Sequence, residues 1–211
     1  MSAVTIVATV SLLLGPPLLH TPVDDRPTLN LTVSDRFGFE QEFLAKIEIE
    51  VSVVFEELDV DVHWTASRGT PLGETGDNGA PGRPGGPARF RVLLAQGPPA
   101  MWNVKDRAMG VVVPSAPARR TVIVFPTRVL TVLGVERPPG APGLGFRTTL
   151  GARAFARVIV HELVHALAPE HSHAEDGLML GTLNRDLLQR RELRLDRECE
   201  EALLSGLRRL R

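Results

Sequence analysis

Tyrosine is absent from this chain of 211 residues, and cysteine occurs only once. The single thiol, Cys199, excludes an internal disulfide and any zinc site built from several cysteines. It falls in a helical pattern with Leu195 and Leu203, which indicates a buried structural thiol rather than a nucleophile. An excess of either charge is also missing, because 24 Lys and Arg residues accompany 25 Asp and Glu residues. Without a basic field or an aromatic platform, we expect no nucleic-acid partner.

The N-terminal segment lacks basic residues before Arg26 and is strongly apolar. Its length suits the hydrophobic region of a signal peptide and is short for a membrane span. A basic start and a clear cleavage site are missing, so a buried strand is the alternative. We expect residues 1–22 to be a signal peptide and the protein to be secreted or periplasmic, with no stable membrane insertion after processing. Residues 23–211 are then expected to form a single domain and to be monomeric.

Hydrophobic periodicity divides this domain into helices and strands. Residues 67–88 are rich in Gly and Pro, which oppose helix and sheet, so we expect a flexible surface insertion there. A second loop is expected at 138–145. The pattern predicts a helix over 39–58, strands over 59–64, 89–94, 109–113 and 121–125, a helical turn over 129–133, a helix over 148–167, and a last helix from Asn184 to the C-terminus.

Four of the six histidines lie within the stretch HELVHALAPEHSHAEDGLM, residues 161–179. His161 and His165 are four apart on the helix expected over 148–167, so their side chains leave the same face and can bind one zinc ion. Glu162 points about a quarter of a turn away on the helix. There it could hold the zinc-bound water, accept its proton and later protonate the leaving amine.

A catalytic zinc site needs a third protein ligand and one open position. His171 follows Pro169, which is expected to end the helix, and a chain that turns back there brings His171 under the metal. His173 is a nearby spare ligand, for which a position outside the coordination shell or no role is the preferred interpretation. Glu192 is a further alternative, because some zinc peptidases take a Glu from a later helix as their third ligand.

The stretch HELVHALAPEH resembles the metzincin zinc-binding motif HExxHxxGxxH in both histidine spacings and in the Glu. The resemblance covers about residues 155–185, and the order of elements elsewhere is similar in layout only. It implies zinc bound by His161, His165 and His171, with Glu162 catalytic. The family also places a Met in a turn beneath the metal, and Met179 of DGLM stands at a suitable distance. The implied fold class is α+β, a metzincin-like zincin with a mostly parallel twisted sheet, an antiparallel edge strand, an active-site helix and a C-terminal helix.

Two departures from the family pattern affect the site. Ala168 replaces the glycine that follows the family's helix, and Pro169 comes next. Because Ala resists a left-handed backbone and a residue before Pro favours an extended one, the turn must be made differently. The tyrosine that some metzincins use near the Met-turn is absent, so zinc and backbone groups would have to stabilise an oxyanion.

The sequence therefore predicts a zinc-dependent endopeptidase with a peptide or protein substrate. By the same resemblance, a peptide is expected to add to the edge strand that contains residues 109–113, through main-chain hydrogen bonds. The alternative is a non-catalytic zinc-binding or interaction module on the same fold. The intact Glu162 favours the enzyme.

Overall fold

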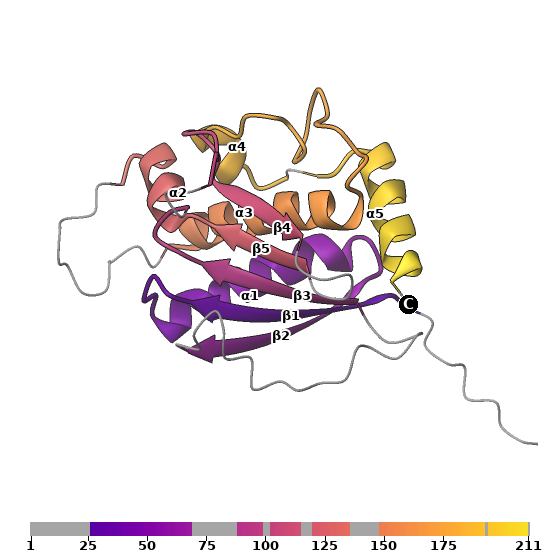
Figure 1. Ribbon diagram of the computed structural model, residues 1–211, viewed down its shortest axis with the longest axis horizontal. Coiled ribbons are helices and arrows are strands. Elements are labelled where there is room, and N and C mark those ends of the chain that lie inside the picture. Colours follow the sequence, from indigo (N-terminus) through magenta and orange to yellow (C-terminus); the bar gives the residue numbers. More distant parts are fainter. Residues whose placement is uncertain are drawn as a thin grey trace, which may run out of the picture.

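The computed structural model describes residues 26–68, 88–98, 102–114, 120–135, 148–192 and 194–210. Five strands form one sheet in the order β2-β1-β3-β5-β4 (Figure 1). The first four strands of this order run parallel, and β4 pairs antiparallel with β5 at the edge. The strands are β1 (Thr28–Asp35), β2 (Asp61–Arg68), β3 (Ala88–Leu94), β4 (Gly110–Pro114) and β5 (Arg120–Val124).

Alternating apolar residues in the inner strands face two long helices. Leu29, Leu31 and Val33 of β1 are at most 1% exposed. The residues that pair with them on β3, and in turn on β5, lie on the same face of the sheet. Helices α1 (Gln41–Glu56) and α3 (Thr149–Leu167) pack side by side on this face of the sheet (Figure 1). The main hydrophobic core lies between the sheet and these helices, since period-two strands and a period-3.6 helix bury their apolar sides against each other.

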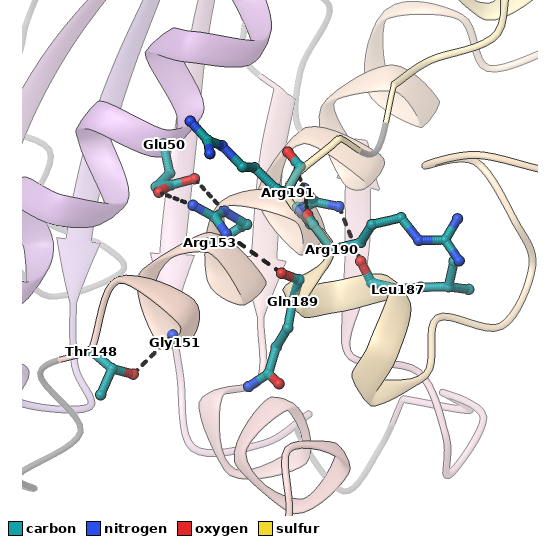
Figure 2. Close-up of polar contacts among 9 residues, drawn as sticks. Glu50, Thr148, Gly151, Arg153, Leu187, Gln189, Arg190 and Arg191 are labelled. Atoms are coloured by element: carbon teal, nitrogen blue, oxygen red, sulfur yellow. Dashed lines mark hydrogen bonds and ion pairs between the residues drawn. The ribbon is translucent and has the colours of Figure 1, made fainter.

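Helix α3 is buried along almost its whole length. Thr148 caps its N-terminus, with the side-chain oxygen accepting a hydrogen bond from the Gly151 amide at 3.2 Å (Figure 2). At the other end, Ala168 has φ −127° and ψ 68°, and Pro169 follows. The chain thus leaves the helix without a left-handed residue, as the Ala-Pro pair predicts. This turn sets the direction of the loop that carries His171 and His173.

Most of the elements expected from periodicity are present. The helix expected over 39–58 is α1, the strands expected after it are β2 to β5, and the expected helical turn is α2 (Pro126–Val132). The expectation of one C-terminal helix is wrong. Arg190 leaves the helical conformation with ψ 135°, so the region contains α4 (Arg185–Gln189), capped by Asn184, and α5 (Arg197–Arg209), capped by Asp196.

Strand β1 was not predicted, although it carries a clear signal. Leu29, Leu31 and Val33 alternate with polar residues, and all three are buried. β1 lies between β2 and β3, and it joins α1 and β2 in a β-α-β unit. Without it the predicted sheet lacks an inner strand.

Helix α5 packs against the C-terminal end of α3. The backbone carbonyl of Leu167 lies where a side chain on Gly206 would start, and Arg209 donates a hydrogen bond to the same carbonyl at 3.3 Å. A glycine at 206 therefore permits the close approach of the two helices.

Three sequence-based expectations concern other parts of the chain. The expected signal peptide at 1–22, most of the Gly/Pro-rich insertion at 67–88 and the loop at 138–145 lie outside the described residues. Within the described ranges, no helix is long and apolar enough to cross a membrane.

Candidate metal centre

Three histidine side chains converge beside α3. The Nε2 atom of His165 lies 3.2 Å from Nε2 of His161 and 3.2 Å from Nε2 of His173. His161 and His165 come from consecutive turns of α3, and His173 comes from the loop after it. One ligand atom from each of the three lies within 4.8 Å of the others.

The spacing of these nitrogens fits a tetrahedral zinc ion. Two imidazole nitrogens at about 2.0–2.1 Å from zinc lie roughly 3.3 Å apart in a tetrahedral arrangement. The two observed separations of 3.2 Å are close to that value. The donor set, three imidazole nitrogens, is also one that catalytic zinc sites use. The side chains present thus fit a zinc ion with one position left for water or substrate.

The ring of His161 is oriented by a backbone carbonyl. Its Nδ1 atom lies 2.9 Å from the carbonyl oxygen of Leu178. Because a carbonyl oxygen only accepts hydrogen bonds, Nδ1 must carry the proton. Nε2 is then unprotonated in the neutral ring and points toward the other two histidines. This outer contact is the kind that fixes the tautomer and orientation of metal-binding histidines.

Burial keeps the histidines on α3 neutral. It lowers the pKa of His165 to about 4, with smaller contributions from the nearby His161, His173 and His171. Burial also lowers the pKa of His161, partly opposed by its hydrogen bond to Leu178. Metal ions bind the neutral imidazole, so the helix presents these two side chains in the form that a metal requires near neutral pH.

Glu162 lies on the same turn of α3 as His161 and is 9% exposed. Burial raises the pKa of its carboxyl group from 4.5 to about 7. Its side chain packs against the backbone of Gly110 on β4, the edge strand. A carboxyl group with a pKa near 7 is suited to accept and return a proton near neutral pH.

This pKa predicts a pH-dependent effect of Glu162→Gln on the metal-free protein. Because the pKa of this carboxyl group is higher in the folded protein than in the unfolded chain, its protonation favours the folded state. This contribution is complete below pH 4.5 and is lost as pH rises through about 7. Gln does not ionise, so the variant should gain about 2–3 kcal/mol of unfolding free energy relative to the parent between pH 5 and pH 8. Urea unfolding at the two pH values in the presence of chelator measures this. An equal difference at both pH values would mean that Glu162 ionises normally.

A tight turn precedes and holds Met179, which is fully buried. Gly177 adopts φ +78°, and a side chain there would start 2.8 Å from the carbonyl oxygen of Arg194, so this position requires glycine. The Ala174 amide donates to the Met179 carbonyl at 2.9 Å, which closes the turn. Leu178, which orients His161, stands between Gly177 and Met179. The turn therefore supports the histidine cluster directly through its backbone.

His171 belongs to a different group. Its Nε2 atom lies 2.8 Å from Sγ of Cys199, and Sγ lies 3.1 Å from Oδ2 of Asp196. Asp196 also accepts a hydrogen bond from the Cys199 amide at 2.8 Å and so caps α5. The structure thus brings His161 and His165 together with His173, while His171 contacts the first turn of α5.

Cys199 and Glu192 are not part of the group formed by His161, His165 and His173. Cys199 is fully buried, and burial, with a further contribution from Asp196, raises its thiol pKa to about 12. A protonated, buried thiol is a poor nucleophile, which agrees with the structural role predicted for it. Glu192 is exposed and lines a cavity together with Asp176, Arg190 and Arg194, apart from the histidine cluster.

Two arginines on α3 hold the end of α4 and the residues just after it. Arg157, only 5% exposed, donates hydrogen bonds to the carbonyl oxygens of Leu187 and Arg190. Arg153 lies between the carboxylate of Glu50 and the carbonyl of Gln189 (Figure 2). Arg157 is one turn before His161, so the helix that carries the histidines also fixes the backbone at 187–191.

Sequence reasoning missed three parts of this site. The first is the position of His173, which the sequence offered only as a spare ligand, since a histidine spacing does not fix the path of a loop. The second is the Leu178 carbonyl, because backbone partners leave no mark in the sequence. The third is Gly110, which the sheet topology brings to Glu162. Arg157 had a visible signal, because it is a charged residue between the apolar residues Ala156 and Val158 of the helix.

Comparison with family models and with curated proteins gave no match. Among solved structures, the chain is similar to archaemetzincin from Methanopyrus kandleri. The likeness covers 89% of this chain and 99% of that chain, with a TM-score of 0.54 and 16% sequence identity. At this identity the likeness concerns the fold. The expected mostly parallel sheet with an antiparallel edge strand is therefore confirmed, in a fold similar to that of archaemetzincin.

Proposed function

We propose that this chain is a zinc-dependent peptidase whose metal ion is held by His161, His165 and His173. The convergence of three Nε2 atoms next to the buried Glu162 carries the proposal. The fold similarity to archaemetzincin supports it, because that protein's name places it among the metzincins. His171 was the third ligand implied by the motif, and it remains the competing candidate for that place.

A metal ion held by these histidines would supply Lewis-acid chemistry: it would polarise a peptide carbonyl and lower the pKa of a water molecule toward neutrality. Glu162 performs the proton transfers in this proposal. Its carboxylate accepts a proton from the attacking water, and the resulting carboxylic acid donates that proton to the leaving amine. Both steps need a carboxyl group that can take up and return a proton, and the burial of Glu162, which raises its pKa, favours proton uptake.

Other groups orient these reacting side chains. The Leu178 carbonyl holds the His161 ring, and the turn that contains Met179 fixes that carbonyl. We assign Met179 a supporting role of this kind. These contacts are formed within the protein itself, so the side chains need little reorganisation on reaction.

A peptide substrate would bind along β4. This strand is the sheet edge beside Glu162, and it pairs on one side with β5. An extended peptide that joins the other side gains main-chain hydrogen bonds and passes close to α3. Pro114 donates no backbone hydrogen bond and so limits the strand at its end.

Metal content and cleavage of a peptide library test this proposal together. We expect about one zinc ion per purified chain, loss of cleavage on treatment with 1,10-phenanthroline, and recovery when zinc is restored. One bound zinc without any cleavage would instead support the non-catalytic zinc-binding module. A purified chain that binds no zinc would contradict both functions.

A further inference from the structure

Gly110, the first residue of β4, lies directly against the side chain of Glu162. A Cβ atom added at Gly110 would lie 2.7 Å from Cγ, 2.8 Å from Oε1 and 2.9 Å from Cδ of Glu162. Carbon atoms in contact are normally about 3.5–4.0 Å apart. Any side chain at position 110 would therefore occupy space that the Glu162 carboxyl group uses.

If a side chain were added at position 110, the Glu162 side chain would be the part that moves. β4 is fixed next to Gly110, because Gly110 pairs with Val124 and the Phe125 amide donates to the Met109 carbonyl at 2.8 Å. Helix α3 is buried on both sides of Glu162. The carboxyl group, at the end of a rotatable side chain, gives way most easily.

Gly110 is not needed for its own backbone conformation. The left-handed glycines among the described residues are Gly38, Gly134 and Gly177, and Gly110 is not one of them. Alanine fits the strand backbone of Gly110, and it also reduces the conformational freedom of the unfolded chain. The requirement for glycine at this position therefore comes from Glu162 rather than from the strand.

We propose that Gly110 is a positioning residue, whose missing side chain lets the Glu162 carboxyl group lie against the edge strand. The proposal rests on the function proposed above, in which Glu162 transfers the protons and β4 receives the substrate. The same strand would then place the peptide main chain and set the position of the base. A shift of about 1 Å in a reacting group can lower a rate by about 100-fold.

The test compares Gly110→Ala with Gly97→Ala in the full chain. Gly97 has no atom within 4 Å of an added Cβ, so the same substitution meets open space there. We expect Gly110→Ala to lower kcat by roughly 100-fold, with zinc content and KM close to the parent values. Gly97→Ala should leave all three unchanged. Parent-like kcat in Gly110→Ala, or loss of zinc from it, would overturn the positioning role.

A second measurement does not depend on activity. In the parent background Gly110→Ala should lower the thermal unfolding midpoint by roughly 2–4 °C, because the added carbon meets Glu162. In a Glu162→Ala background the same change should be neutral or stabilising, since the space is free. Equal effects in both backgrounds would overturn the contact itself. If the parent protein proves inactive, the proposed function fails, whereas this thermal comparison still decides the contact.

Discussion

Glu162→Gln should lower kcat by about 10²–10⁴-fold, the usual contribution of a general acid or base. Gln has nearly the same shape as Glu but cannot accept a proton from water. The side chain is 9% exposed and is confined between α3 and β4, so solvent is poorly placed to replace it as the base. Cleavage of a fluorogenic peptide at saturating concentration measures the effect.

The result is informative only if zinc remains bound. Glu162 does not belong to the group of residues whose ligand atoms converge, so zinc content should stay at about one per chain. Glu170→Gln is the matched control, because Glu170 is exposed just beyond the end of α3. It should keep parent-like turnover. Full activity in the Glu162→Gln variant would remove the proposed base and leave the chemistry unexplained.

The second large effect concerns the third histidine. His173→Ala should weaken zinc binding by more than the roughly 10–100-fold that follows loss of an outer contact to a metal ligand. His173 contributes one of the three converging nitrogens, at 3.2 Å from His165. A competitive titration with a chromogenic chelator measures the affinity.

His171→Ala is the paired variant and should change zinc affinity little. His171 contacts Cys199 at 2.8 Å, so its loss should instead weaken the contact between the loop and α5. The opposite pattern, with zinc affinity lost in His171→Ala and kept in His173→Ala, would favour the ligand set implied by the motif. The loop after Pro169 would then have to rearrange when the metal binds.

The helix that carries the site could be predicted closely from sequence. Apolar spacing and Thr148 define the start of α3, Pro169 limits its end, and the four-residue spacing places His161 and His165 on one face. These features are local, because they depend on the chain within a few residues. The antiparallel edge strand was implied by the family resemblance, and the sheet order agrees with it.

Features that depend on distant residues could not be predicted in this way. The choice between His171 and His173 depends on the Ala168 backbone and on Cys199, which is 28 residues from His171. The apolar residues between α4 and α5 continued a helical pattern, although Asn184 and Asp196 each cap a separate helix. Cap residues, which are local, could have shown that break.

The contact between Gly110 and Glu162 belongs to the same class. Fifty-two positions separate the two residues, and only the antiparallel pairing of β4 with β5 brings the strand over α3. A glycine at the start of a strand has many possible reasons in a sequence. Its reason here becomes visible only when the space beside it is known.

X-ray absorption spectroscopy at the zinc edge tests the central claim most directly. The proposed site predicts three imidazole nitrogens at about 2.0–2.1 Å, one further oxygen ligand and no sulfur. The spectrum of His173→Ala should show one imidazole fewer, and that of His171→Ala should match the parent. A sulfur atom at about 2.3 Å would place the metal at Cys199 and contradict the three-histidine site.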